Sequence, residues 1–210
     1  MTHSAQKTVL FDMDGVLIDA REWHYDALNE ALDIFGYQIS SLDHLERFDG
    51  MTTKMKLKIL SDERGLPSSL HDLISDVKQD RTLRIAASNC YPNVQHLILI
   101  FRLRELGFKV GVVTNSIRKT AEFMLNYAGI LDYLDILITN EDVERGKPSP
   151  EGYLKAMKEL GATPEDTWVV EDGEYGVEAA RNAGANVIRV SAPDDVNLQI
   201  FENVFPELLR

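Results

Sequence analysis

The sequence has 210 residues, of which 44% are hydrophobic and 27% are charged, and its formal net charge is −12. This composition excludes a disordered chain, a collagen-like chain and a small disulfide-stabilised scaffold. The length is that of one large domain, or of a core with an inserted domain. Since the negative charge would repel phosphate backbones and anionic lipid, we expect neither a nucleic acid nor a membrane among the partners.

Cys90 is the only cysteine of the chain, which excludes an internal disulfide and a cysteine-based zinc site. Such cysteine usage is typical of a reducing compartment. Residues 1–7 lack the apolar segment of a secretory signal peptide. The longest apolar run, at residues 97–101, is too short to span a membrane. We therefore expect a cytoplasmic protein, and the sequence predicts no particular oligomeric state.

The first predicted element is a strand at Val9–Phe11, followed by a long stretch, residues 19–89, with helical periodicity and no clear strand. We expect three helices in this stretch, the first ending near Gly36 and the third covering residues 70–83. The apolar face of the first helix consists of Trp23, Ala27, Leu28, Ala31 and Leu32. The apolar face of the second helix consists of Met51, Met55, Ile59 and Leu60. A helical insertion directly after the first strand predicts a cap domain.

From Pro92 onward, predicted helices alternate with short, almost wholly apolar strands, which are typical of a parallel sheet covered on both faces. Helices are expected at residues 97–106 and 175–183, and two more run from the N-cap Ser116 to Gly129 and from the N-cap Ser149 to Gly161. Strands are expected at residues 110–113, 136–138, 168–170 and 187–190. The alternation predicts an α/β fold, a Rossmann-like doubly wound parallel sheet. Residues 1–18 and 90–210 would form this core, with an all-helical cap domain inserted at residues 19–89.

The strand ends carry the residues that point to chemistry, because ligands bind at the carboxyl ends of parallel strands. The residues expected there are Asp12 and Asp14 after the first strand, Thr114 and Asn115 after the second, Lys147 after the third, and Glu171 and Asp172 after the fourth. With Met13 turned away, Asp12 and Asp14 would project into one crevice. Clustered carboxylates require a divalent cation or raised pKa values, and such oxygen ligands suit Mg²⁺. Thr114, backbone N–H groups near Asn115, and Lys147 could bind a phosphate group.

Four segments of the chain resemble, in order, the four motifs of the haloacid dehalogenase-like phosphohydrolases. They are Phe-Asp-Met-Asp-Gly-Val-Leu at residues 11–17, Val-Thr-Asn-Ser at 113–116, Lys-Pro-Ser-Pro at 147–150 and Val-Glu-Asp-Gly-Glu-Tyr-Gly-Val at 170–177. The resemblance extends over residues 8–190, and the position of the helical insertion is similar to the branch that includes β-phosphoglucomutase and phosphoglycolate phosphatase. In the fourth motif, Gly173 stands where this family usually has serine.

The resemblance implies an enzyme, a phosphatase that hydrolyses a small phosphorylated metabolite, such as a sugar phosphate, through an aspartyl-phosphate. Asp12 would be the nucleophile, and Asp14 would act first as the general acid and then as the general base. The dehalogenases of this superfamily lack the second acid, so Asp14 favours phosphate over halide substrates. Thr114 and Asn115 would hold the phosphoryl group, and Lys147 would bridge Asp12 and the phosphate.

The same resemblance implies that Mg²⁺ is the cofactor. The carboxylates of Asp12 and Asp172 and the backbone carbonyl of Asp14 would hold the ion, and Glu171 would act through a metal-bound water. Two other functions use a similar set of residues. One is a sugar phosphomutase of the β-phosphoglucomutase type, and the other is a phospho-aspartate signalling module that is not an enzyme.

Substrate contacts in the cap are expected from His24, Gly50 and Thr53. His24 resembles a histidine at that place in β-phosphoglucomutase, and residues 49–53 resemble the loop that reads the substrate in this branch. Four further basic residues could face the substrate or simply form exposed helix faces. These are Lys54, Lys56, Arg81 and Arg84.

Overall fold

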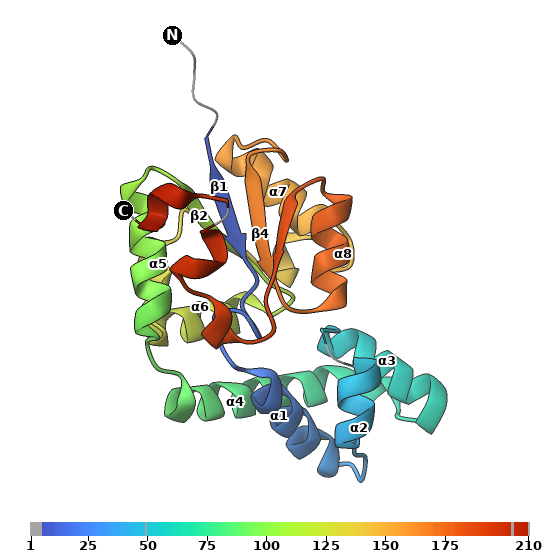
Figure 1. Ribbon diagram of the computed structural model, residues 1–210. Helices are drawn as coiled ribbons and strands as arrows, with labels where there is room; N and C mark the ends of the chain where they lie inside the picture. Colours follow the sequence, from blue (N-terminus) through green and yellow to red (C-terminus); the bar gives the residue numbers. More distant parts are fainter. Residues whose placement is uncertain (1–5, 49, 203, 210) are drawn as a thin grey trace. The chain divides into compact units, whose positions relative to one another are not determined.

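The computed structural model describes residues 6–48, 50–202 and 204–209, which belong to two units (Figure 1). The first, here called the α/β unit, consists of the described residues of Met1–Asp19 and Tyr91–Arg210. The second, here called the helical unit, is Ala20–Cys90. Each unit has its own apolar core and is described by itself.

A parallel five-stranded sheet forms the centre of the α/β unit. Its strands are β1 (Thr8–Phe11), β2 (Lys109–Val113), β3 (Ile136–Ile138), β4 (Thr167–Glu171) and β5 (Asn186–Arg189). They lie in the order β3-β2-β1-β4-β5, and every neighbouring pair is parallel. The predicted α/β fold with a doubly wound parallel sheet is confirmed, and each predicted strand agrees with the structure to within one residue.

Helices cover both faces of this sheet. They are α5 (Val94–Glu105), α6 (Arg118–Tyr127), α7 (Glu151–Leu160) and α8 (Glu174–Asn182), with short helices η3 (Leu131–Tyr133), η4 (Asn140–Asp142), η5 (Pro193–Asp195), η6 (Leu198–Phe201) and η7 (Pro206–Leu209). In Figure 1, α5 lies on one side of the sheet, and α7 and α8 lie on the other. Across the part of the chain that the structure describes, no helix has both the length and the apolar character that crossing a membrane requires.

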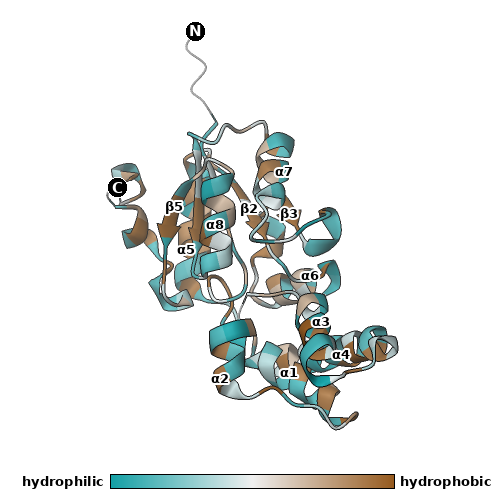
Figure 2. Cartoon of the chain, turned by 90° about the vertical axis from the view of Figure 1, so that its right-hand side faces the viewer, coloured by the Kyte–Doolittle hydropathy of each residue, from teal (hydrophilic) through white to brown (hydrophobic). Residues whose placement is uncertain are grey.

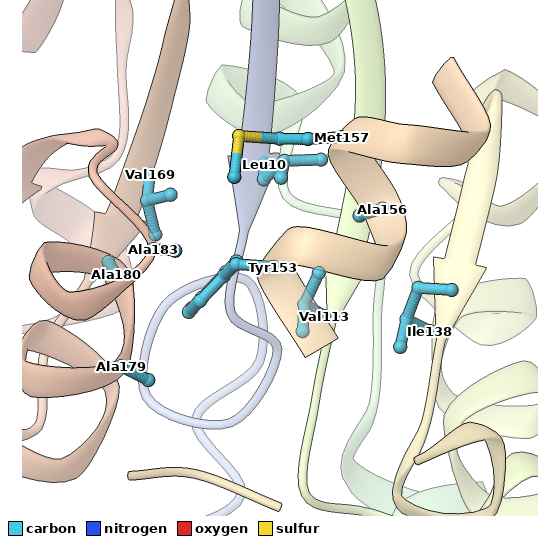
Figure 3. Packing of buried hydrophobic residues seen from close by; sticks show 10 residues of the cluster. All are labelled: Leu10, Val113, Ile138, Tyr153, Ala156, Met157, Val169, Ala179, Ala180 and Ala183. Atoms are coloured by element: carbon cyan, nitrogen blue, oxygen red, sulfur yellow. The ribbon is translucent and has the colours of Figure 1, made fainter. Parts of the chain in front are cut away.

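Apolar side chains of the strands pack beneath α7 and α8, where small residues on α8 let the helix approach the sheet closely. The buried cluster consists of Leu10, Val113, Ile138, Tyr153, Ala156, Met157, Val169, Ala179, Ala180 and Ala183 (Figure 3). The strands are mostly brown in Figure 2, whereas much of the surface of the surrounding helices is teal. Because neighbouring residues of a strand face opposite sides of the sheet, this burial on both faces accounts for the apolar runs in the sequence.

Gly111 in β2 lies where the sheet has no room for a side chain. An added Cβ would overlap the Cγ2 atom of Ile136 and would lie 2.9 Å from Cδ2 of Leu10. We expect Gly111→Ala to lower the free energy of unfolding in urea by about 1–3 kcal/mol, the usual cost of overpacking a core. Gly173→Ala is the matched control, since no heavy atom lies within 4 Å of a Cβ there. Equal stability of the two variants would contradict this packing.

The helical unit contains the three predicted helices, and its described residues form no strand. Its elements are α1 (Arg21–Asp33), α2 (Ser41–Asp43), the π-helix η1 (His44–Phe48), α3 (Thr53–Arg64), η2 (Ser68–Leu70) and α4 (His71–Asn89). The predicted apolar face of the second helix is wrong in part, because Met55 is exposed whereas Leu57 and Leu60 are buried. The unpredicted segment η1 supplies Phe48 to the core of this unit, and α3 turns Leu57 and Leu60 into the same cluster.

Candidate active site

Three neighbouring strands end at the candidate active site. Phe11, the last residue of β1, pairs in register with Val112 of β2 and Val170 of β4. The backbone N–H of Asp12 donates to the carbonyl of Val170 at 3.0 Å, which places Asp12 beside the end of β4. Because parallel strands lie side by side about 4.8 Å apart, the residues that follow β1, β2 and β4 meet at one edge of the sheet. This convergence is what the sequence predicts.

The loop after β1 directs two carboxylates one way and an apolar side chain the other. Met13 is fully buried, whereas Asp12 and Asp14 are only half-buried. The carbonyl of Met13 accepts hydrogen bonds from the N–H groups of Leu17 and Ile18, both at 2.9 Å, which closes the loop tightly. Gly15 has a φ of +87°, a conformation that residues with a side chain rarely adopt.

Gly15 also leaves space for a carboxylate from another strand. A Cβ at Gly15 would overlap the Oδ2 atom of Asp172. We expect Gly15→Ala to displace Asp172 and to lower kcat/KM by about 100-fold, because small misplacements at a reacting centre have effects of that size. The matched control is Gly107→Ala, which has a φ of +80° but no heavy atom within 4 Å of a Cβ. If both variants lost the same activity, backbone strain rather than displacement of Asp172 would be the cause.

Lys147 reaches the site from the loop after β3. Its Nζ atom lies 2.6 Å from Oδ1 of Asp12 and 2.6 Å from Oε1 of Glu171. The loop is held by Asn115, whose Oδ1 accepts from the backbone N–H of Lys147 at 2.9 Å and whose Nδ2 donates to the carbonyl of Lys147 at 3.4 Å. Gly146 leaves room for that amide, because a Cβ there would overlap Oδ1 of Asn115. The side chain of Asn115 therefore positions Lys147.

Thr114, the other residue predicted to bind phosphate, follows β2. Its N–H donates to the carbonyl of Ile138 at 2.9 Å, and its Oγ1 accepts from the N–H of Ser116 at 3.0 Å. The side chain is buried. Thr114 and Asn115 thus occupy the start of the turn that leads from β2 toward α6, next to the loop that carries Lys147.

Negative charge exceeds positive charge at this edge of the sheet. Burial, together with the Glu171 carboxylate, raises the pKa of Asp12 well above its ordinary value, although the Lys147 ammonium acts in the opposite direction. Burial alone would lower the pKa of Lys147, but the carboxylates of Asp12 and Glu171 outweigh it and raise that pKa. Burial and the Glu171 carboxylate also raise the pKa of Tyr153 well above its ordinary value, so its hydroxyl keeps its proton.

The donor set fits a divalent cation. Asp12, Glu171 and Asp172 each place one carboxylate oxygen so that the three atoms lie within 4.8 Å of one another. With Asp14 beside them, four carboxylates surround the single ammonium of Lys147 among the described residues of this edge. A divalent cation would neutralise the surplus charge that raises the pKa of Asp12, and clustered carboxylate oxygens are ligands that Mg²⁺ accepts.

Two further contacts complete the site: one involves Ser116, which ends the second motif, and the other involves Tyr153, which no sequence pattern assigns to the site. The hydroxyl of Ser116 donates to Oδ2 of Asp14 at 2.9 Å, and the hydroxyl of Tyr153 donates to Oε1 of Glu171 at 2.6 Å. The expectation that Ser116 is the N-cap of α6 is wrong, because the N-cap is Ile117. The expected N-cap Ser149 is also displaced by one residue, since Pro150 occupies that position in α7.

The three cap residues predicted to contact substrate belong to the helical unit. Nδ1 of His24 lies 3.0 Å from Nζ of Lys78, a residue that the sequence analysis does not single out. Thr53 is the first residue of α3, directly after its N-cap Thr52. Gly50 is exposed. Asp49, which belongs to the same expected loop, lies outside the described residues.

The other basic residues considered for the cap have different environments. Arg81 pairs with Glu30 at 3.2 Å, and Arg84 pairs with Asp80 at 2.9 Å. Lys56 is buried. Arg81 and Arg84 are therefore engaged in ion pairs on the helices of this unit, as side chains of a solvated helix face commonly are.

Comparisons with known proteins identify the family to which the chain belongs and the fold that it shares. A family model described as haloacid dehalogenase-like hydrolase matches residues 9–190. Pyrophosphatase PpaX of Bacillus cereus (strain AH820) is 29% identical over 195 residues, which cover 88% of this chain and 82% of that protein.

Solved structures of other proteins share the fold, among them the two that follow. β-Phosphoglucomutase from Clostridium difficile has a TM-score of 0.83 at 19% identity, covering 97% of this chain and 99% of that one. CbbY from Rhodobacter sphaeroides, solved in complex with phosphate, has a TM-score of 0.80 at 24% identity, covering 88% of this chain and 85% of that one. At these identities the likeness is one of fold.

Proposed function

Because the chain belongs to the haloacid dehalogenase-like hydrolases, we propose that it is a Mg²⁺-dependent phosphatase that hydrolyses a small phosphorylated metabolite, such as a sugar phosphate, through an aspartyl-phosphate. The observation that carries the proposal is the placement of Lys147, whose ammonium lies 2.6 Å from Asp12 in a cluster of carboxylates. Phosphoryl transfer depends on positioning and on neutralising charge. A buried lysine beside a half-buried aspartate offers both.

Asp12 would attack the substrate in the first step. A bond forms between an Oδ atom of Asp12 and phosphorus, and the bond between phosphorus and the leaving oxygen breaks. Lys147 already holds Oδ1 of Asp12, so the reacting carboxylate has a fixed orientation. A carboxylate nucleophile divides the hydrolysis into two easier steps.

Asp14 would move the protons in both steps. Its carboxyl group gives a proton to the leaving oxygen in the first step. In the second step it takes a proton from water, whose oxygen attacks phosphorus and releases phosphate, restoring Asp12. General acid–base catalysis of this kind contributes about 10²–10⁴-fold to a rate. Ser116, which donates to Oδ2 of Asp14, would orient the carboxyl group between the two transfers.

Asp12, Asp172 and the backbone carbonyl of Asp14 would hold Mg²⁺, with Glu171 acting through a water. The ion would polarise the phosphoryl oxygens and neutralise part of their charge. Thr114 and the backbone N–H of Asn115 would donate to the same phosphoryl group. The side chain of Asn115 is not assigned to the phosphate, because it bonds the backbone of Lys147.

We assign the helical segment, residues 19–89, to the role of a cap that excludes water from the reaction. Its position in the chain, between β1 and α5, supports this assignment. His24, Gly50 and Thr53 are the residues through which it would recognise the substrate.

The test is a phosphate-release screen of the purified protein with Mg²⁺. The panel contains sugar phosphates, phosphoglycolate, nucleotides and inorganic pyrophosphate, the last because of the similarity to a pyrophosphatase. We expect release from at least one small substrate and loss of that release when the metal is chelated. Failure with every compound would overturn the proposal.

The same screen distinguishes the phosphomutase alternative. A mutase uses the same nucleophile but protects the aspartyl-phosphate from water, so it moves phosphate between two positions of one sugar. A mutase would isomerise a sugar phosphate, and a bisphosphate would stimulate that isomerisation. Free phosphate would then not be the main product. Free phosphate as the main product would exclude it.

A further inference from the structure

Tyr153 is a buried residue of α7 that combines an apolar ring with a polar contact to the site. Its ring belongs to the cluster under α7 and α8, where Figure 3 shows it together with Leu10 and Met157. The residue has no exposed surface. Its hydroxyl donates to Oε1 of Glu171 at 2.6 Å, a short distance of the kind found where a hydroxyl meets a carboxylate.

Glu171 is held by several groups at once. Oε1 accepts from both Tyr153 and Lys147, each at 2.6 Å, and Oε2 lies 3.2 Å from the backbone N–H of Asp172. Gly176 in α8 leaves the space that this carboxylate fills, because a Cβ there would overlap both carboxylate oxygens. The carboxylate therefore has one place in the fold, and the hydroxyl of Tyr153 fixes one side of it.

The ammonium of Lys147 completes the chain of contacts. It lies 2.6 Å from Glu171 and 2.6 Å from Asp12, so the two carboxylates compete for one positive charge. The same Nζ atom lies 5.2 Å from the centroid of the Tyr153 ring. The hydroxyl of Tyr153 and the ammonium of Lys147 both bond Oε1 of Glu171. The hydroxyl offsets part of the negative charge on that oxygen, so Glu171 attracts Lys147 less strongly than it would without the hydrogen bond.

We propose that Tyr153 is a positioning residue, which acts through Glu171 to hold the ammonium of Lys147 against Asp12. The catalytic consequence rests on the proposed function, in which Lys147 neutralises charge on Asp12 and on the phosphoryl group. Without the hydroxyl, Glu171 draws Lys147 away from Asp12. The rate of phosphoryl transfer then falls, whereas the affinity for the substrate does not change.

The variant that tests this is Tyr153→Phe, which keeps the ring and removes only the hydroxyl. We expect kcat to fall about tenfold, the scale of a hydrogen bond to a charged group, while KM changes by less than about threefold. Tyr127→Phe is the matched control, because it removes a hydroxyl from a tyrosine that is 42% exposed. It should leave both constants unchanged.

A double-mutant cycle with Glu171→Gln separates positioning from a purely structural role. If Tyr153 acts through Glu171, the Tyr153→Phe change should lower kcat by less than about twofold in the Glu171→Gln background. A full tenfold loss in that background would overturn the proposal, since the two residues would then act independently.

A spectroscopic readout tests the proposal without turnover. In protein labelled with ¹⁵N-lysine, the ammonium signal of Lys147 is identified by its loss in Lys147→Met. We expect that signal to shift in Tyr153→Phe and to stay in place in Tyr127→Phe. An unshifted signal would overturn the positioning role even if the enzyme hydrolyses phosphate. If the signal shifts but the protein has no phosphatase activity, the positioning role of Tyr153 is supported and only the proposed function is contradicted.

The wild-type protein provides a measurement should Tyr153→Phe fail to fold. The hydroxyl proton of Tyr153 is shielded from solvent and bonded to Glu171, so it should exchange slowly with water and give its own proton resonance. Its resonance should move in Glu171→Gln. If the wild-type spectrum contains no slowly exchanging tyrosine hydroxyl proton, the hydrogen bond does not exist and the proposal is overturned.

Discussion

Asp12→Asn should abolish phosphate release, lowering kcat/KM by at least about 10⁴-fold, because enzymes that lose their nucleophile lose activity on that scale. The amide has nearly the shape of the carboxylate, so substrate binding should persist. The measurement is steady-state kinetics on the best substrate of the screen, with binding followed separately by calorimetry.

The same variant should remain folded. Burial and the neighbouring Glu171 carboxylate raise the pKa of Asp12 in the folded state. A carboxyl group whose folded pKa is raised costs stability once the pH exceeds its unfolded pKa. Asparagine removes that cost, so the free energy of unfolding at pH 7–8 should be no lower than in the wild type.

An exposed aspartate provides the control for this experiment. Asp132 in η3 is exposed, and Asp132→Asn should leave kcat/KM unchanged. Retention of more than about a tenth of the wild-type kcat/KM in Asp12→Asn would contradict the assignment of the nucleophile. Loss of the fold in that variant would contradict the electrostatic account of the site.

Lys147→Met should be the most destabilising of the site variants. It leaves the buried carboxylate of Glu171 and the half-buried carboxylate of Asp12 without their common partner. Removing one member of a buried ion pair costs about 3–5 kcal/mol, and we expect a loss of that size in urea unfolding at pH 8. We also expect kcat/KM to fall at least about 100-fold, because the charge that offsets Asp12 and the phosphoryl group is gone.

The stability loss in Lys147→Met should depend on pH. Asp12 has a raised pKa already in the wild type, and removal of the ammonium raises it further. A group with a raised acidic pKa destabilises the fold as the pH rises, so the deficit should be largest near pH 8 and should shrink toward pH 5, where a proton replaces the lost charge.

Two variants complete this test. Adding Glu171→Gln to Lys147→Met should restore part of the stability, because one of the two unpaired charges is removed. Lys119→Met, at an exposed position, should change the free energy of unfolding by less than about 0.5 kcal/mol. A loss in Lys147→Met that does not vary between pH 5 and pH 8 would show that packing, and not charge, is responsible.

The strands and the carboxylates at their ends could be predicted from sequence because both depend on local patterns. Apolar runs of three to five residues mark strands buried on both faces, and the residue after each run lies at the sheet edge. Asp12, Thr114 and Asp172 come from β1, β2 and β4, which are neighbours in the sheet. Only the parallel fold was needed to bring them together.

Other parts of the site depend on contacts between distant elements, which no local pattern encodes. Lys147 follows β3 by several residues; its position after that strand predicts its place in the site, but its simultaneous contact with Asp12 and Glu171 depends on elements far apart in the chain. Tyr153 lies on the apolar face of α7, where a tyrosine looks like any other core aromatic. The sequence predicts Ser116 as a helix cap because serine commonly has that role, whereas its hydroxyl donates to Asp14 in the loop after β1.

The helical unit shows the same limit of local patterns. Helical spacing predicts Met51, Met55, Ile59 and Leu60 as the apolar face of the second helix of this unit. The core takes Leu60, as predicted, together with Leu57, and Met51 and Ile59 pack against it, whereas Met55 is exposed. The buried face was decided by the neighbours of α3, including η1, a short π-helix that sequence periodicity does not indicate.

The most direct test is to identify the residue that carries phosphate during turnover. Enzyme mixed with Mg²⁺ and a substrate labelled in its phosphoryl group is quenched in acid within one turnover, and its peptides are mapped. We expect the label on Asp12 and no label in Asp12→Asn. Label on any other residue, or turnover with no labelled aspartate at all, would contradict it.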